Sequence, residues 1–188
     1  MKEIINLPDF SDLHLLIVGD IMIDRYISGD VKRISPEAPV PVVDQKRYEN
    51  RAGGAANVAL NVLNLGAKAT LLSIAGEDEA KLVLNEVLDK YSGLKLDIYT
   101  CPDRKTTVKT RIMAGNQHLL RVDNEDKHDI NVTQEKEIMD RFSKLLSTDT
   151  INGVILQDYN KGLLTPQVIE SIINFCVSKG IPTFVDPK

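Results

Sequence analysis

Apolar residues follow two different periods along this chain. Short unbroken apolar runs, typical of strands buried on both faces of a parallel sheet, occupy residues 13–20, 69–76, 153–159 and 181–188. Between these runs, apolar residues recur every three or four positions, as on one face of a helix, over residues 80–91, 138–146 and 169–176. The alternation predicts an α/β fold in which helices flank a parallel sheet.

Residues that favour helix ends support this assignment. The last helix has Thr165 as its expected N-cap, Pro166 at its first position and Gly180 just past its end. The stretch "RAGGAANVALNVLNLGA" predicts a further helix over 54–65, which Gly66 ends. Three apolar residues of that helix are expected to face the core: Val58, Leu63 and Leu65.

Two segments do not fit the pattern of a parallel sheet. Residues 31–50 contain three prolines, at positions 36, 39 and 41, which exclude a central strand because proline cannot donate to the ladder. Residues 105–126 alternate apolar and polar side chains around "AGNQ", which indicates a hairpin with a Gly-Asn turn. We expect these lid segments, about 31–52 and 105–123, to form a small antiparallel sheet inserted in one domain that spans 1–188.

Composition narrows the class of protein. The 188 residues carry 23 Lys and Arg against 27 Asp and Glu, a net charge of −4, and no Trp, which disfavours nucleic acid as a partner. The apolar runs are too short to span a bilayer, and residues 1–12 carry acids and a proline where a signal peptide needs an apolar stretch. Two distant cysteines without a CxxC motif fit a reducing compartment. We expect a cytoplasmic protein without a membrane partner.

Acidic residues follow three of the predicted strands. They are Asp20 and Asp24 after the first run, Asp158 after the third and Asp186 in the fourth. Parallel sheets bind ligands beyond the carboxyl ends of their strands, so these carboxylates would line a polar crevice able to accept hydrogen bonds from sugar hydroxyls. Each of them taken singly also fits a helix cap or a turn.

The small residues before the 54–65 helix have two interpretations. Gly53 and Gly54 would let a ligand approach the backbone at a helix N-terminus, where Asn57 adds an amide that both donates and accepts. Close packing of helix on sheet requires small residues as well. The stretch matches neither GxGxxG nor GxxxxGK[ST], so it supports neither a dinucleotide site nor a P-loop.

Basic residues could complement an anionic group such as a phosphate, if several of them point into the crevice. Solvated surface positions are the alternative for each of them. The candidates are Arg25, Arg33, Lys109, Arg111, Arg121 and Lys161.

Five segments in order resemble the ribokinase-like (PfkB) sugar kinases: "GDIMIDRY", "RISPEAPVPVV", "AGGAANVALNVLNLGA", "TTVKTRIMAGNQHLLRVD" and "DYNKGLLT". "RISPEAPVPV" and "DYNKG" narrow the resemblance to the D-glycero-D-manno-heptose 7-phosphate kinases. The resemblance implies a ribokinase-like sheet with a β lid that closes over the sugar and pairs two copies in a homodimer. It implies transfer of phosphate from ATP, with Mg²⁺, to the anomeric hydroxyl of heptose 7-phosphate. The product, heptose 1,7-bisphosphate, is a precursor of ADP-heptose and of the lipopolysaccharide core.

The resemblance also assigns residues by position. Sugar hydroxyls would contact Asp24, Gly53, Gly54 and Asn57. The lid would enclose the heptose with Arg33, Ser35 and Glu37. The distal phosphate and the lid face would use Lys109, Arg111, Gln117 and Arg121. The floor would consist of Asp158, Tyr159 and Lys161, and the side towards ATP of Asp186 and Lys188.

Two segments of the family are missing from the sequence: an Asn-x-x-Glu segment linked to magnesium and a Gly-Ala-Gly-Asp segment that supplies the anion hole and the general base. We therefore expect an N-terminal part, truncated before the nucleotide-binding half, with no catalytic residue or metal ligand of its own and little turnover alone. Its last strand would leave an open edge that favours self-association or marginal stability. A kinase for another sugar and a non-catalytic sugar-binding or oligomerisation module are the alternatives.

Overall fold

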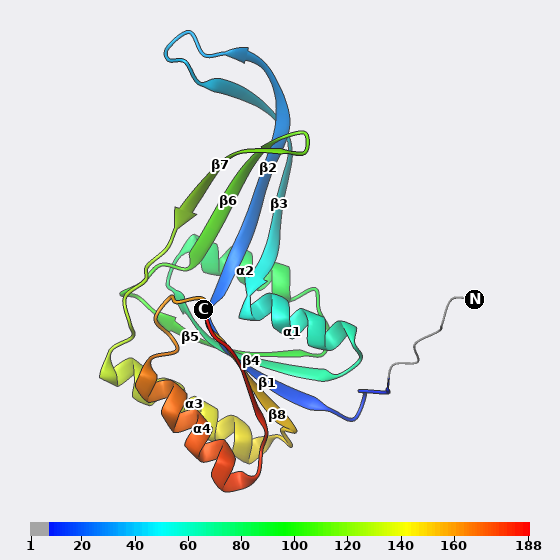
Figure 1. Cartoon of the computed structure of the whole chain (residues 1–188), viewed down its shortest axis with the longest axis vertical. Coiled ribbons are helices and arrows are strands. Elements are labelled where there is room, and N and C mark those ends of the chain that lie inside the picture. Colours follow the sequence, from blue (N-terminus) through cyan, green and yellow to red (C-terminus); the bar gives the residue numbers. More distant parts are fainter. Residues whose placement is uncertain (1–7) are drawn as a thin grey trace, which may run out of the picture.

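A five-stranded parallel sheet forms the base of the molecule, described here from a computed structural model for residues 8–188 (Figure 1). Its strands lie in the order β5 (Leu94–Cys101), β4 (Lys68–Gly76), β1 (His14–Gly19), β8 (Gly153–Gln157) and β9 (Thr183–Asp186). The four strands predicted from apolar runs are confirmed. The sequence analysis missed β5, because this half-buried edge strand interleaves its apolar residues with Lys95 and Asp97.

Two pairs of helices cover the two faces of this sheet (Figure 1). The helices α1 (Ala55–Asn64) and α2 (Glu79–Leu88) pack on one face, and α3 (Val132–Thr148) and α4 (Pro166–Lys179) on the other. Successive residues of a strand point to opposite faces. In β1 the Ile17 side chain therefore belongs to the apolar core beneath α1 and α2, while Leu16 and Val18 belong to the core beneath α3 and α4. The predicted α/β architecture is confirmed.

The predicted ends of α4 are also confirmed. The Thr165 hydroxyl accepts a hydrogen bond from the Val168 N–H, and Gly180 ends the helix in the left-handed conformation. For α1, Gly66 takes the expected positive φ of 93°. The expectation for Leu65 was wrong: it lies past the last helical residue and is 56% exposed.

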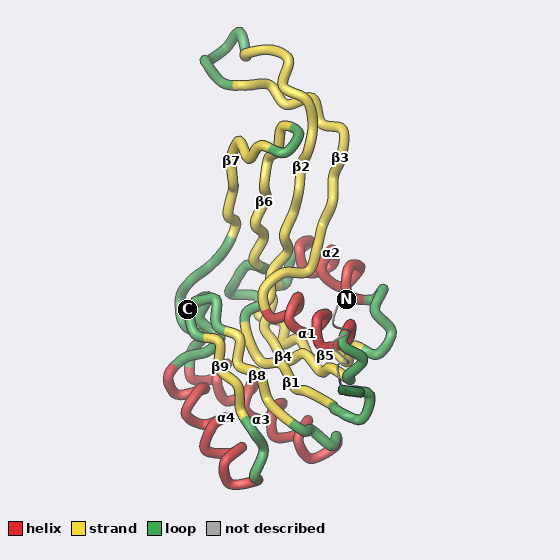
Figure 2. Tube along the Cα trace, turned by 45° about the vertical axis from the view of Figure 1, so that its right-hand side comes forward, coloured by secondary structure: helices red, strands yellow, loops and turns green. Residues whose placement is uncertain are grey.

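A second sheet, the lid sheet, projects from the base (Figures 1 and 2). Its order is β3 (Pro41–Gly54), β2 (Ile21–Ile34), β6 (Thr107–Ala114) and β7 (Gln117–Asn124). Its outer pairs are antiparallel as expected, but β2 and β6 pair in parallel, so the sheet is mixed. The first lid strand begins at Ile21, before the expected boundary near residue 31. Pro41 opens β3, an edge strand, where its missing donor costs no ladder bond.

Side chains of the lid sheet divide into two faces with different chemistry. One face, called here the charged lid face, carries two rows that the strand register places side by side. They are Arg51, Asp24, Lys109 and Asp123, and then Glu49, Tyr26, Arg111 and Arg121. The opposite face, the apolar lid face, carries the row Tyr48, Ile27, Ile112 and Leu120.

Two further expectations were that the chain does not span a membrane and has no signal peptide. Among residues 8–188, the structure contains no helix with the length and apolarity needed to cross a bilayer. The segment on which the expectation of no signal peptide rests lies partly outside the described residues.

Gly54 joins the lid to α1 and provides a test of this fold. It has a φ of 60°, and a Cβ atom there would collide with the Asp20 carbonyl oxygen, so Gly54→Ala should lower the free energy of unfolding by about 2–5 kcal/mol. Gly66→Ala is the matched control. It shares the positive φ but has open space around its Cβ, so strain alone should cost about 1–2 kcal/mol. Equal losses for the two variants in urea denaturation would contradict the packing described here.

Candidate active site

The lid stands over the carboxyl ends of β1 and β8, where Asp20 and Asp158 follow their strands. From β1 the chain adds β4 and β5 on one side, and later β8 and β9 on the other. Such a switch point in a parallel sheet leaves a crevice in which ligands bind. The predicted location of the site therefore matches the topology.

Glu125 ties the charged lid face to the base. One of its carboxylate oxygens accepts a hydrogen bond from Lys109 Nζ of β6 (3.0 Å), and the other from Lys161 Nζ of the loop after β8 (2.9 Å). The side chain is only 5% exposed. Burial alone would raise the pKa of Glu125, but hydrogen bonds from Lys161, Lys109 and Lys127 outweigh it and lower this pKa to about 2. The carboxylate stays ionised and holds two of the predicted site lysines.

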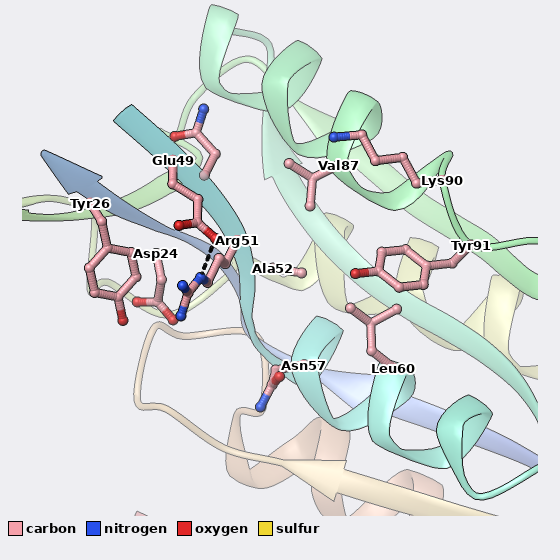
Figure 3. Close-up of a pocket in the computed structure, with 11 residues that line it drawn as sticks. Asp24, Tyr26, Glu49, Arg51, Ala52, Asn57, Leu60, Val87, Lys90 and Tyr91 are labelled. Carbon is pink, nitrogen blue, oxygen red and sulfur yellow. Dashed lines mark hydrogen bonds and ion pairs between the residues drawn. The ribbon is translucent and has the colours of Figure 1, made fainter. Parts of the chain in front are cut away.

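Asp24 lies at the centre of the charged lid face (Figure 3). Its Oδ1 atom accepts a hydrogen bond from Arg111 Nη1 at 2.5 Å. The guanidinium groups of Arg111 and Arg51 lie 5.3 Å and 4.9 Å from the centre of the Tyr26 ring, and Arg51 pairs with Glu49 at 2.7 Å. The structure thus places a carboxylate able to accept from sugar hydroxyls beside two guanidinium groups able to bind a phosphate.

A cleft of about 490 Å³ opens beside β3 and α1 (Figure 3). Asp24, Tyr26, Arg51 and Asn57 line it together with Lys90 and Tyr91, which follow α2. Asn57 lies in the first turn of α1 and is exposed to the cleft, and its contact with a sugar stays a prediction. The cleft is large enough for a sugar phosphate.

The two glycines before α1 are explained by protein contacts. Both are buried, and a Cβ atom on Gly53 would lie 2.5 Å from the Asp24 Oδ2 atom. Gly54 lies against the main chain of Asp20, whose carbonyl oxygen accepts the Ala55 N–H. The packing interpretation therefore accounts for the missing Cβ atoms, and a contact of this backbone with sugar stays a prediction.

Asp20 supports the loop after β8. Its carboxylate accepts hydrogen bonds from the main-chain N–H groups of Tyr159 (3.0 Å), Lys161 (3.0 Å) and Leu163 (3.3 Å). Burial raises the pKa of Asp20, and the three N–H groups oppose that shift. Asp158 and Tyr159 of this loop are half-buried, and the Asp158 side chain accepts the Asn160 N–H. Asp20 therefore fixes the predicted floor and is almost fully enclosed itself.

Several predicted residues lie away from this centre. Arg33, Ser35 and Glu37 belong to the far tip of the β2–β3 hairpin, which Figure 1 shows beyond the β6–β7 turn. Gln117 begins β7 at that distant end of the lid. Arg25 lies on the apolar lid face, where its Nε donates to Asn50, so it does not join the basic cluster. Arg121 lies on the charged lid face but pairs with Asp123.

The residues expected on the side towards ATP do not form an enclosed site. Asp186 and Lys188 are exposed, and the Asp186 carboxylate accepts a hydrogen bond from the Gln157 amide at 2.7 Å. Among residues 8–188, no three His, Cys, Asp or Glu side chains come together as ligands for a metal ion. The described residues therefore do not fit a nucleotide or magnesium site, and we derive no step through either.

Four residues of the site were missed from the sequence: Tyr26, Glu49, Arg51 and Glu125. The first three share the charged lid face because they alternate with residues of the other face along β2 and β3. Glu49 and Arg51 lay inside the expected lid segment 31–52, whereas Tyr26 lay before it and required the strand to begin at Ile21. Glu125 had no such signal, because its position depends on how the lid meets the loop after β8.

A family profile and several known proteins match this chain in sequence. The pfkB family carbohydrate kinase profile matches residues 12–187. The bifunctional protein HldE of Geobacter sulfurreducens is 41% identical over 179 residues, which cover 94% of this chain and 36% of that protein. HldE of Vibrio vulnificus is 42% identical over 188 residues, which cover 100% of this chain and 38% of that protein. The chain thus spans little more than a third of the length of these relatives.

Solved structures show the same fold. A possible 1-phosphofructokinase from Thermotoga maritima matches with a TM-score of 0.72 at 14% identity, covering 93% of this chain and 54% of that one. A ribokinase from Arabidopsis thaliana, complexed with ribose and ATP, matches with a TM-score of 0.59 at 18% identity, covering 92% and 52%. The ribokinase-like fold expected from the resemblance is confirmed.

The Glu125 cluster predicts a pH dependence of stability. A pKa lowered to about 2 in the folded state contributes stability above the unfolded value near 4.5, and this is lost as the pH falls towards 2. We expect the stability difference between the unmodified chain and Glu125→Gln to shrink by about 2 kcal/mol between about pH 5.5 and pH 3. Urea denaturation across this range measures it. Glu86→Gln on α2 is the control, and a difference for Glu125→Gln that is constant with pH would contradict the assignment.

Proposed function

The chain belongs to the pfkB family of carbohydrate kinases, and from this premise we propose that it forms the sugar-binding part of a sugar-phosphate kinase. The proposed reaction is ATP-dependent phosphorylation of heptose 7-phosphate at its anomeric hydroxyl, which gives heptose 1,7-bisphosphate for ADP-heptose and lipopolysaccharide synthesis in the cytoplasm. HldE is the name of the relatives. The 41% sequence identity to one of them supports a related substrate.

The observation that carries this proposal is the position of Asp24 between Arg51 and Arg111 at the crevice. A carboxylate offers several acceptor sites to the hydroxyls of a polyol. Two guanidinium groups offer bidentate donors to a phosphate, which favours a phosphorylated over an uncharged sugar. The Tyr26 ring lies within reach of both guanidinium groups and helps to fix where they point.

The chain's own residues bind and orient the sugar in this proposal. Asp24 and Asn57 contact hydroxyls, with the Gly53–Gly54 backbone at the edge of the site, and the loop with Asp158 and Tyr159 forms the floor. ATP with Mg²⁺ would be the source of the phosphoryl group in the complete kinase, and no described residue is assigned to hold either. Because phosphoryl transfer depends on an anion hole and a positioned base, we propose that this chain alone binds the sugar with little turnover.

Two other functions remain as alternatives. A kinase for another sugar would prefer a substrate without a distal phosphate, and the guanidinium pair beside Asp24 argues against it. A non-catalytic sugar-binding or oligomerisation module would bind the sugar phosphate equally well. It would be distinguished by an absence of kinase activity in the complete natural protein.

Variants of the charged lid face test the substrate class by calorimetry with heptose 7-phosphate and with unphosphorylated heptose. Asp24→Ala should weaken binding of both sugars, and Arg51→Ala only that of the phosphorylated one. Each loss of a charge-assisted hydrogen bond should cost roughly 10- to 100-fold in affinity. Arg25→Ala is the control. Arg25 follows Asp24 in β2 but lies on the apolar lid face, so this variant should bind both sugars normally. Unchanged affinity in Asp24→Ala would refute the proposed site.

We also propose that two copies pair through the apolar lid face. Tyr48, Leu120 and Val122 are about half exposed there, whereas Val108, on the same face nearer the base, is buried. Pairing is one arrangement that brings the distal hairpin tip, with Arg33, Ser35 and Glu37, to a sugar bound by a second copy.

Sedimentation velocity tests the pairing. Leu120→Lys places a charge on the apolar lid face and should convert a dimer into a monomer. Val177→Lys is the matched control, because Val177 is 71% exposed on α4, remote from the lid. A monomeric unmodified chain, or a Leu120→Lys variant that sediments as a dimer, would rule out pairing through this face.

A further inference from the structure

The loop after β8 has two residues with positive φ, and both are types that tolerate this conformation, Asn160 and Gly162. Asn160 has a φ of 54°, in the left-handed region that costs most residues energy. Gly162 has a φ of 89°, and any Cβ atom there would collide with the His128 carbonyl group. Side chains from two other parts of the chain hold this loop in place. Asp20 holds the N–H side of this loop.

Arg104 holds the carbonyl side. It lies in the connection between β5 and β6 and is 8% exposed. Its Nη2 atom donates to the main-chain carbonyls of Lys161 at 2.7 Å and of His128 at 3.1 Å. Both main-chain polar groups of Lys161 are therefore held, the N–H by Asp20 and the carbonyl by Arg104.

The Arg104 guanidinium is unusual in two further respects. Within residues 8–188 its Nη1 atom is buried without a hydrogen-bond partner, and no carboxylate there lies within 4 Å of the group. Arg104, Asp20 and Lys161 together line a small cavity of about 10 Å³, room for about one oxygen atom. Asp20 and Asp126 line the same cavity, so the guanidinium has carboxylates nearby, but its hydrogen bonds go to main-chain carbonyls and not to an acid.

We propose that Arg104 is a positioning residue of the sugar site. By fixing the Lys161 carbonyl, it sets the loop that presents Asp158 and Tyr159 to the crevice, while its charge favours an anionic ligand. This inference rests on the proposed function, because the loop matters only if its residues meet the sugar. It adds a residue of the β5–β6 connection to a site otherwise built from the lid, α1 and the loop after β8.

A fluorescent reporter tests the position of the loop without any ligand. The chain has no Trp, so Tyr159→Trp gives one fluorophore in the loop. In that background Arg104→Lys keeps the charge but loses the guanidinium whose Nη2 atom donates to both carbonyls. We expect redder emission and easier acrylamide quenching, with the far-ultraviolet circular dichroism unchanged. Lys105→Met, which removes the neighbouring exposed cation, should leave the emission as it was.

Ligand binding supplies the second readout. Arg104→Lys in the otherwise unmodified chain should bind heptose 7-phosphate at least 10-fold more weakly, and millimolar guanidinium should restore part of the affinity of Arg104→Ala. Full affinity in Arg104→Lys, with unshifted emission, would overturn the proposal by showing that charge alone suffices. A variant that unfolds completely would overturn it as well, by making Arg104 a residue of global stability.

The two readouts separate this inference from the proposed function. If the unmodified chain fails to bind heptose 7-phosphate while Arg104→Lys still shifts the reporter, the proposed substrate is wrong and the loop-positioning role stands. If the unmodified chain binds and the variants match it, the role of Arg104 is wrong and the proposed substrate stands.

Discussion

The site depends on the hydrogen bonds that one buried residue, Asp20, forms through its main chain and its side chain. Its N–H donates to the Gln157 carbonyl, and its own carbonyl accepts the Ala55 N–H at the start of α1. Its carboxylate holds the loop after β8 through three N–H groups. Strand β1, the lid, α1 and the floor of the crevice therefore meet at one residue. The requirement for glycine at position 54 follows, since a side chain there would collide with the Asp20 carbonyl.

The lid adds to this junction a sheet whose two faces have different roles. Alternation along four strands collects the charged side chains on one face and the apolar ones on the other, because neighbouring strands are in register. The charged lid face is tied to the base through Glu125. The same register that builds the charged lid face also leaves Tyr48, Leu120 and Val122 about half exposed on the opposite face.

The sequence predicted those features that depend on local pattern. Apolar runs revealed four parallel strands because such strands are buried on both faces, and Thr165 and Gly180 marked α4 because caps are local. Asp20 was expected in the crevice, but its use as a backbone acceptor depends on a loop nearly 140 residues away. The lid was recognised, but its parallel β2–β6 pairing and the distance of Glu37 from the cleft depend on topology, which one strand's pattern does not contain.

The charges of the site are mostly paired before any ligand arrives. Asp24 holds Arg111, Glu125 holds Lys109 and Lys161, and Glu49 holds Arg51. A sugar phosphate that uses these groups must exchange existing ion pairs for new ones, so the net gain per pair is smaller than for a free charge. Arg104 differs, because its guanidinium donates to main-chain carbonyls, while Asp20 and Asp126 only line the same small cavity. In the proposed function, selectivity for a phosphorylated sugar would then depend on how much the exchanged pairs of the lid gain over the existing ones.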